Sequence, residues 1–295
     1  MRIGIGIGDV RGPNTAKALV HQAQQARDAG FDTVWAAQAM GWDSLVALAT
    51  VGAAVPGLRL GTSVVPVPQR HPLVLASQAL SVQAATGNRL TLGIGAGVST
   101  LTARMFGLTN DRPARRLREY LTVLKPLLRG ESVDHRTDTL TAFGAVGVPG
   151  AEPPEVLLAA LGPAMLRVAG ELADGAVTWM TGPRTLADHI VPTITRYAAA
   201  PRVVAGLLTC VTHNEAAVRA RIGEQFAIAE QVAEYRAVLD REGVTSPGDV
   251  VVAGDEDSVS RQLRRIRDAG ATDFLAVPYG TEEEQARTLK VLAAT

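Results

Sequence analysis

The segment from Leu58 to Gly97 is the part of the sequence that most restricts the possible fold. An apolar stretch at Leu58–Val65 is followed by a loop, by helical spacing over Pro72–Thr86, and by a second apolar stretch at Arg89–Ile94. A strand, a helix and a second strand in this order predict a parallel βαβ unit. Such units bind ligands at the carboxyl ends of their strands, so the residues that follow these two strands are the first candidates for a site.

The same alternation continues along the whole chain. Eight short apolar stretches, each followed by a helical pattern, favour a closed (β/α)₈ TIM barrel over an open sheet, because open doubly wound sheets usually have fewer strands. The predicted strands are Arg2–Ile7, Asp32–Ala36, Leu58–Val65, Arg89–Ile94, Val156–Ala160, Gly175–Trp179, Arg202–Val211 and Thr272–Val277. The predicted helices are Asn14–Ala29, with Asn14 as its N-cap, then Asp43–Val55, Pro72–Thr86, Arg112–Arg129, Pro163–Ala173, Thr185–Ala198, Glu215–Glu242, Asp257–Ala269 and Glu282–Leu292.

Two departures from a minimal barrel are expected. Glu131–Pro154 lacks helical spacing and is rich in Gly, Thr and Pro, so it is predicted to be an inserted excursion after the fourth helix, with room for a small hairpin. Two helical segments instead of one separate the seventh and eighth strands. We expect residues 1–295 to form one α/β domain, because barrels of this kind reach this length without dividing.

Charge and cysteine content limit the possible partners. The formal net charge is zero, which argues against nucleic acid and anionic membrane surfaces as partners. Cys210 is the only cysteine, so no internal disulfide can form and a reducing compartment fits. No stretch approaches the ~20 uninterrupted apolar residues of a membrane span, and the amino terminus lacks the apolar run of a signal peptide. These features predict a cytoplasmic protein.

The glycines of the first strand do not form a dinucleotide-binding fingerprint. Gly4, Gly6 and Gly8 alternate, but that fingerprint requires a third glycine where this chain has Arg11. The second strand also runs into Gln38 without the acidic residue that would hold a ribose. The interpretation that we favour is that small residues let the first strand fit a crowded barrel interior.

Serine-nucleophile and metal chemistry find no support in the sequence. There is no G-x-S-x-G motif, and the histidines lack ligand spacing, so no metal is expected. The five histidines are His21, His71, His135, His189 and His213. His71 directly precedes a proline after the third strand, where it could cap the following helix or line a site.

Three segments together resemble a known family. They are GTSVVPVPQRHP at the third strand, GNRLTLGIGAG at the fourth, and LLAALGPAMLRVAGELADGAVTW around the fifth and sixth. The chain resembles the luciferase-like monooxygenase superfamily, and within it the actinobacterial branch that uses the deazaflavin coenzyme F420. The Ala-Ala-x-Gly-Pro segment with its later Ala-Asp-Gly turn is the most branch-specific piece. The resemblance extends over essentially the whole chain, and it implies a (β/α)₈ barrel, a bound F420 and a homodimer.

The resemblance also implies where the cofactor binds. A bulge at Ser63-Val64, often with a cis peptide in the family, would press on the ring, although an ordinary buried strand is the alternative. The loop at Gly95–Gly97 would expose backbone to the ring or simply turn the chain. The turn at Ala159–Pro163 would hold the phosphate, because backbone N–H groups at a helix start favour anions; a tight turn without a ligand is the alternative. The implied cofactor-binding residues are Ser63, Val64, Gly95, Ala96, Gly97, Ala159, Ala160, Leu161, Gly162 and Pro163.

The substrate pocket is expected to contain Gln38, Trp42, Val98 and Trp179, although for both tryptophans the alternative is to cover the core under a loop. The sugar-phosphate dehydrogenase branch of the family has a histidine where this chain aligns Gln38 and a glutamate where it has Val98. Neither replacement titrates near neutral pH, so an acid–base pair able to oxidise an alcohol is missing. The resemblance therefore favours reduction, with the proton supplied by solvent or by a donor such as Tyr279. The catalytic residues are otherwise undetermined, with Gln38 and Tyr279 as candidates.

Three functions follow from these expectations. The first is an F420-dependent oxidoreductase that transfers hydride between the deazaflavin and a small organic substrate, reducing an activated C=C or C=N bond. The second keeps the barrel but uses reduced FMN from a partner reductase in a two-component monooxygenase. The third is an F420-binding protein without turnover, for which the missing acid–base pair is the only support.

Overall fold

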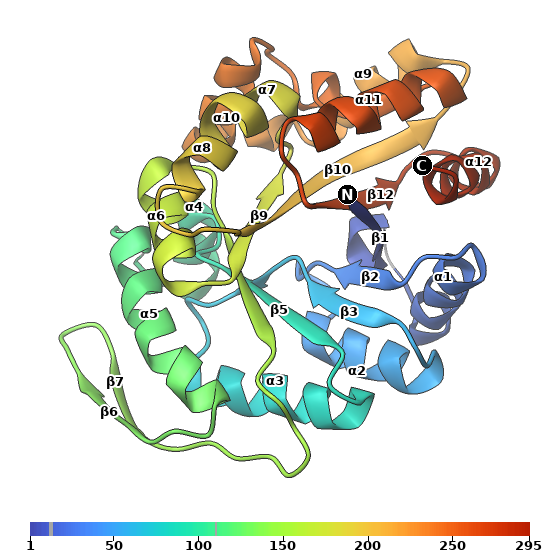
Figure 1. Cartoon of the computed structure of the whole chain (residues 1–295). Coiled ribbons are helices and arrows are strands. Elements are labelled where there is room, and N and C mark those ends of the chain that lie inside the picture. Colours follow the sequence, from blue (N-terminus) through green and yellow to red (C-terminus); the bar gives the residue numbers. More distant parts are fainter. Residues whose placement is uncertain (12–13, 110) are drawn as a thin grey trace.

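The structure, a computed structural model, describes residues 1–11, 14–109 and 111–295 (Figure 1). Within these residues, eight parallel strands close into a barrel, with β1 paired to β12 and β9 paired to β10. The predicted (β/α)₈ fold is confirmed. The barrel strands are β1 (Arg2–Ile7), β2 (Thr33–Ala36), β3 (Arg59–Thr62), β5 (Leu90–Gly95), β8 (Glu155–Ala159), β9 (Gly175–Trp179), β10 (Arg202–Val211) and β12 (Asp273–Pro278).

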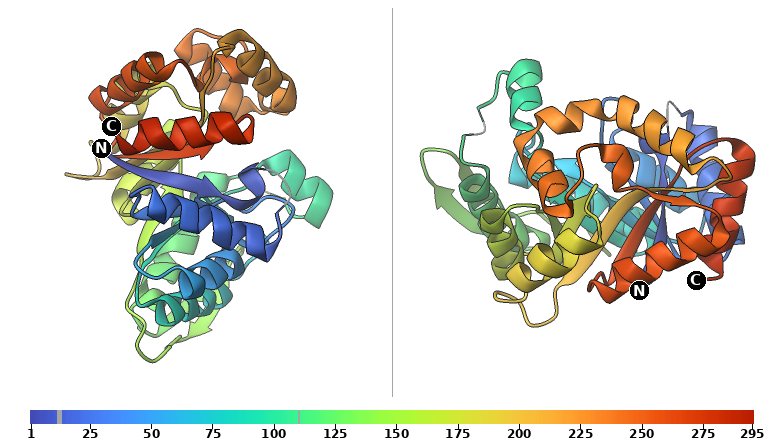
Figure 2. Two further views of the ribbon diagram at one scale, coloured as in Figure 1. Left: turned by 90° about the vertical axis from the view of Figure 1, so that its right-hand side faces the viewer. Right: turned by 90° about the horizontal axis from the view of Figure 1, so that it is seen from above.

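Helices surround the strands on the outside of the barrel (Figure 2). Capping side chains explain where several of these helices begin. Asp43 accepts hydrogen bonds from the N–H groups of Leu45 and Val46 at the start of the second helix, and Thr281 forms a capping box at the start of the last helix. The main helices are α1 (Ala16–Asp28), α2 (Ser44–Ala54), α3 (Pro72–Thr86), α5 (Pro113–Leu128), α6 (Pro163–Leu172), α9 (Glu215–Gln225), α10 (Ala233–Glu242), α11 (Glu256–Asp268) and α12 (Glu282–Ala293).

Several boundaries differ from the predictions. The N-cap of α1 is Thr15 and not Asn14, whose side-chain amide instead donates to the carbonyl of Gly8. The helix expected over Glu215–Glu242 is broken between α9 and α10 by a 3₁₀ segment, Ala227–Gln231. The helix expected at Thr185–Ala198 is α7 (Pro183–Thr185), a π-helical turn at Leu186–Ile190, and α8 (Val191–Ile194).

Two short elements were missed by sequence reasoning. Helix α4 (Ser99–Phe106) follows β5, and its N-cap residue makes no side-chain capping bond, so no start signal marks it. Strand β11 (Val252–Gly254) has only three residues and pairs with the far end of β10, which is long enough to extend past the barrel. The region between the last two barrel strands therefore contains a strand as well as the predicted extra helices.

The predicted excursion at 131–154 contains an antiparallel hairpin. Its strands β6 (Val133–Arg136) and β7 (Thr141–Gly144) project from the barrel beside α5 (Figure 1). A ring nitrogen of His71 lies 2.8 Å from the carbonyl oxygen of Thr141, which ties the hairpin to the start of α3.

Glycines in the barrel wall make room for one large side chain. Trp35 on β2 is only 2% exposed and fills the barrel interior. A Cβ on Gly4 would lie 2.5 Å from Trp35 Nε1, and one on Gly61 would lie 2.2 Å from Trp35 Cε3. The interpretation of the first-strand glycines as a packing feature is confirmed.

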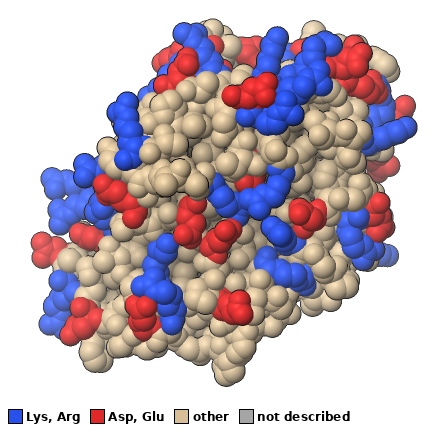
Figure 3. Space-filling model, in the orientation of Figure 1, with Lys and Arg blue, Asp and Glu red and all other residues tan. Residues whose placement is uncertain are grey.

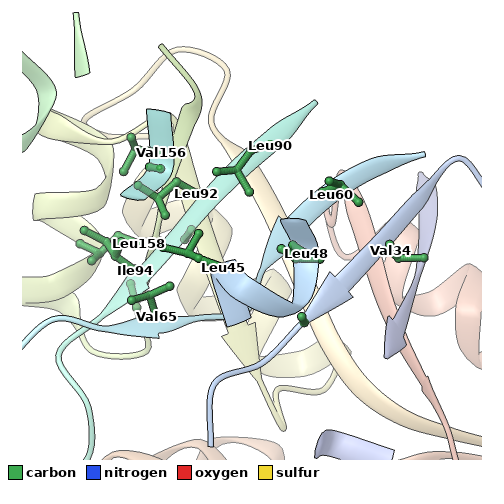
Figure 4. Close-up of a cluster of buried hydrophobic side chains, with 14 of the residues drawn as sticks. Val34, Leu45, Leu48, Leu60, Val65, Leu90, Leu92, Ile94, Val156 and Leu158 are labelled. Carbon is green, nitrogen blue, oxygen red and sulfur yellow. The ribbon is translucent and has the colours of Figure 1, made fainter. Parts of the chain in front are cut away.

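A second layer of aliphatic side chains lies between the strands and the helices (Figure 4). Leu45 and Leu48 of α2 lie close to strand residues such as Leu60 and Leu92, all at most 2% exposed. Each such side chain stabilises the fold by about 1.5–3 kcal/mol through burial. Aliphatic residues therefore supply most of this layer, as the low aromatic content requires.

Charged residues close the amino end of the barrel. Asp273, at the start of β12, lies 3.0 Å from Arg2 Nε and 2.8 Å from Arg202 Nη2, and Arg202 also pairs with Glu155. These are the first residues of four barrel strands. On the face shown in Figure 3, acidic and basic side chains are intermixed.

Candidate active site

The third strand bends at the carboxyl end of the barrel. Strand β3 ends at Thr62, the Ser63-Val64 peptide bond is cis, and the chain resumes pairing with β5 through β4 (Val65–Pro66). The N–H of Ser63 donates to the carbonyl of Ala36 on β2 at 2.9 Å. The cis peptide expected at this position is confirmed.

Two glycines of β5 accommodate this bend. A Cβ on Gly93 would lie 2.0 Å from the carbonyl oxygen of Thr62, and one on Gly95 would lie 2.8 Å from Val64 Cγ2 and 3.1 Å from Ala159 Cβ. The Thr62 hydroxyl donates to the Gly93 carbonyl at 2.7 Å and accepts from its N–H at 2.8 Å. Val64, Gly95 and Ala159 therefore meet across three neighbouring strands, and we call them the mouth floor.

Apolar side chains surround the barrel interior at this end. Val10, Val64, Trp179, Phe226 and Tyr279 are partly buried and pack against the interior cluster around Trp35. We call these five residues the apolar rim. Sequence reasoning identified Val64, Trp179 and Tyr279 but missed Val10 and Phe226, since neither lies in a recognisable motif.

Tyr279 is held in place by its polar end. Its hydroxyl donates to Gln225 Oε1 at 3.1 Å, and the guanidinium carbon of Arg221 lies 6.0 Å from the ring centroid. A cation at this distance can interact with the ring face. The hydroxyl of this proton-donor candidate is therefore already engaged with an amide.

The turn Ala159–Pro163 connects β8 to α6 beside the mouth floor. Gly162 is the N-cap of α6, makes no side-chain capping bond, and is followed by Pro163 at the first helical position without an acidic residue in the first turn. The first N–H groups of a helix have no partner within the helix. These N–H groups are of the kind that bind anions, and the phosphate role of this turn stays a prediction.

A histidine that sequence reasoning did not assign contacts this turn. His189, in the π-helical turn, places Nε2 2.9 Å from the carbonyl oxygen of Leu161. Burial lowers the pKa of His189, and the charge of Arg241 adds to this, whereas the bond to Leu161 raises it; the net pKa is below the usual value. The ring is therefore neutral at neutral pH, with its proton on Nε2, because a carbonyl can only accept.

Gln38 is fixed by a network at the end of β2. Its Oε1 accepts from Arg70 Nη2 at 3.1 Å, from the Ser44 hydroxyl at 3.3 Å and from the Ser44 N–H at 3.4 Å. Arg70, with only 10% of its side chain exposed, also pairs with Asp43. Since a guanidinium and a backbone N–H only donate, these bonds settle which amide atom is the oxygen and leave the Gln38 NH₂ group for another acceptor.

Arg70 and its neighbour Tyr120 are further residues that the sequence did not reveal. The Arg70 Nη1 atom and the Tyr120 hydroxyl are buried, and neither has a hydrogen-bond partner among the described residues. Burial raises the pKa of Tyr120, so its hydroxyl stays protonated. No local motif distinguishes this arginine from the other 25 in the sequence.

Trp42 and the loop after β5 lie to one side of the interior cluster. The indole N–H of Trp42 donates to the Asn14 carbonyl at 2.8 Å, and its ring packs with the cluster between strands and helices, as Ala96 does. Gly97 has a φ of 69°, which favours glycine, and Val98 is the N-cap of α4. The structure thus brings Val64, Gly95, Ala159, Trp179 and Tyr279 together, whereas the pocket role of Trp42 stays a prediction.

His71 caps α3 with both ring nitrogens engaged. Nδ1 accepts from the Leu73 N–H at 3.3 Å, while Nε2 bonds to the Thr141 carbonyl. The capping role is the one that the structure supports. Among the described residues no group of three or more acidic, histidine or cysteine side chains could hold a metal ion, and no helix has the length and apolar character to cross a membrane.

Comparison with known proteins gives the family. The model of the luciferase-like monooxygenase family matches residues 2–293. A putative coenzyme F420-dependent oxidoreductase of Mycobacterium tuberculosis is 27% identical, and the alignment covers 99% of both chains. The family expected from the sequence is therefore confirmed.

Solved structures with the same fold cover nearly the whole chain. An F420-dependent secondary alcohol dehydrogenase in complex with an F420-acetone adduct has a TM-score of 0.82 at 17% identity, covering 100% of this chain and 99% of that one. The oxygenating constituent of 3,6-diketocamphane monooxygenase from Pseudomonas putida, in complex with FMN, has a TM-score of 0.77 at 16% identity, with 99% and 97% covered. The chain belongs to the luciferase-like monooxygenase family.

Proposed function

We propose that this protein is an F420-dependent oxidoreductase that transfers hydride between the deazaflavin and a small organic substrate, in the direction that reduces an activated C=C or C=N bond. The observation that carries the proposal is the mouth floor, where Val64, Gly95 and Ala159 form a surface free of bulky side chains next to the apolar rim. A flat ring could pack against such a surface, because Gly95 has no side chain and Ala159 has only a methyl group.

The residues around the floor suit the rest of the cofactor. The turn Ala159–Pro163 offers N–H groups to a phosphate at the edge of the floor. The apolar rim would exclude water around the ring, which favours hydride transfer over side reactions. When bound, the deazaflavin would supply a ring carbon that accepts and donates hydride but activates oxygen poorly. Ser63 and the loop Gly95–Gly97 would border the ring.

F420 is favoured over FMN by the mycobacterial relative, whose name describes F420-dependent chemistry. The direction of the reaction is argued from Gln38 and Val98, neither of which can take a proton from an alcohol near neutral pH. The second candidate, a two-component FMN monooxygenase, is favoured by one observation, the FMN complex of the Pseudomonas putida neighbour with the same fold.

The test of the cofactor is a parallel titration with F420 and FMN that follows tryptophan fluorescence. Trp179 lies in the apolar rim, so a ring on the mouth floor should quench its emission. We expect saturable quenching by F420 at micromolar concentration and much weaker quenching by FMN. Trp179→Phe is the control, since the quenching should fall while binding measured by calorimetry persists. A preference for FMN with oxygen consumption would favour the monooxygenase, and binding without hydride transfer to any acceptor would favour a storage protein.

Gln38 is proposed to donate a hydrogen bond to the substrate from its free NH₂ group. Replacing it with Leu should reduce kcat/KM for enone and imine acceptors by about 100- to 1,000-fold, the range for losing one donor to a developing charge, while F420 affinity stays the same. Gln38→Glu is the matched variant, because it keeps the oxygen that Arg70 and Ser44 bind but loses the donor. If Gln38→Glu turned over such acceptors as fast as the wild type, the donor role would be wrong.

A further inference from the structure

A π-helical turn sits behind the phosphate-binding candidate, and its cause is in the sequence. Pro192 has no N–H to donate to the carbonyl four residues before it, so the regular helical pattern is interrupted. The N–H of Val191 instead bonds to Leu186, five residues back. Leu186 and Ile190 are completely buried and anchor the turn in the core. Single π-helical turns of this kind are frequent at functional sites.

The turn places His189 against the connection between β8 and α6. Its Nε2–H donates to the Leu161 carbonyl at 2.9 Å. Helix α8, which follows the turn, packs against α6. The π-helical turn therefore holds His189 in place, and His189 in turn fixes the Leu161-Gly162 peptide group at the start of α6.

The fixed peptide determines where the next N–H points. In a trans peptide the C=O and the following N–H point in opposite directions, and Ser63-Val64 is the only cis bond in the described part of the chain. With the Leu161 carbonyl bound by His189, the N–H of Gly162 must point away from the histidine. Within residues 1–11, 14–109 and 111–295, no protein acceptor for this N–H is found.

The neighbouring strand carries a buried polar group that is unsatisfied. The Thr178 hydroxyl on β9 is buried, with Thr178 only 1% exposed, and it has no hydrogen-bond partner among the described residues. Its backbone directly follows Val177, whose carbonyl accepts from the N–H of Ala160 in this connection. Buried hydroxyls are normally satisfied in native structures, so this one is an unusual polar group on the strand next to the connection.

We propose that His189 is a positioning residue that orients the Leu161-Gly162 peptide so that the Gly162 N–H binds the phosphate of the cofactor. The role rests on the proposed function, because it requires a phosphate at the start of α6. His189 does not touch the reacting ring. It acts on cofactor affinity and not on hydride transfer, so its loss should raise KM for F420 without changing kcat.

The experiment compares F420 with Fo, the deazariboflavin that lacks the phosphate and its tail, in binding titrations of the full chain. His189→Phe keeps a ring but removes the donor, and we expect its Kd for F420 to rise about fivefold to tenfold, the value of one hydrogen bond, with the Kd for Fo unchanged. His189→Gln can place an amide N–H near the position of Nε2, so it should stay within about twofold of the wild type.

The outcomes separate the two proposals. If wild-type protein binds F420 no tighter than Fo, there is no phosphate site and the proposed cofactor mode is wrong, whatever the variants do. If the wild type prefers F420 but His189→Phe keeps that preference, the positioning role is wrong. It is also wrong if both ligands weaken equally, which would indicate general damage, or if His189→Gln loses as much as His189→Phe.

Discussion

Gly93→Ala is expected to lower the free energy of unfolding by about 3 kcal/mol or more, or to prevent folding. The new Cβ would lie 2.0 Å from the Thr62 carbonyl oxygen, well inside any real contact distance, and 3.0 Å from Val64 Cγ1. Overpacking a rigid interior typically costs 1–3 kcal/mol, and here the opposing atom is backbone that cannot rotate away. The substitution would also displace the Thr62 hydroxyl, which bonds to both polar groups of Gly93.

The measurement is urea unfolding followed by circular dichroism, with Gly147→Ala as the matched control. A Cβ on Gly147 would meet no atom within 4 Å, so this change should be neutral within about 0.5 kcal/mol. Equal stability of Gly93→Ala and Gly147→Ala would mean that β3 and β5 are not packed as described. A folded Gly93→Ala variant should also lose F420 binding, because Val64 would leave the mouth floor.

The barrel was predictable because its evidence is local and repeated. The apolar stretches and the helical spacing each follow from neighbouring residues, so errors at one boundary did not alter the number of strands. The first-strand glycines were also interpreted correctly, since their spacing failed the dinucleotide fingerprint at Arg11. In contrast, α4 and β11 carry weak local signals, and their positions depend on contacts with the rest of the fold.

The candidate site was predictable where it lies on the ends of strands. The bend at Ser63-Val64 came from the family resemblance, and the glycines that accommodate it lie on a different strand. His189 and Arg70 could not be found in this way, because each acts on a residue about 30 positions away in the sequence. Trp42 was placed near the mouth from its position after a strand, and the bond from its indole N–H to the Asn14 carbonyl was not foreseen, because that partner lies 28 residues earlier in the sequence.

Asp273→Asn is expected to lower the free energy of unfolding by about 3–4 kcal/mol at neutral pH. The carboxylate is almost completely buried and bonds to Arg2, to Arg202 and to the Thr272 hydroxyl. Removing one partner of a buried ion pair leaves the other charge uncompensated, which costs about 3–5 kcal/mol. The lower part of this range applies, since Arg2 is 47% exposed and can turn to water, and Arg202 keeps its ion pair with Glu155.

The effect should depend on pH in a direction set by the pKa of Asp273. Burial alone would raise this pKa, but the bonds to Arg202, Thr272 and Arg2 outweigh it, so the folded pKa lies below the usual value. The carboxylate therefore stabilises the fold fully above the unfolded pKa of about 3.9 and loses this contribution as the pH falls through the folded pKa. Unfolding free energies of wild type and Asp273→Asn should converge below about pH 4.

Asp28→Asn, which breaks an exposed pair with Arg27, is the control and should change stability by less than about 1 kcal/mol at any pH. A difference between wild type and Asp273→Asn that stays constant into acid would show that the lost charge is not what destabilises the variant.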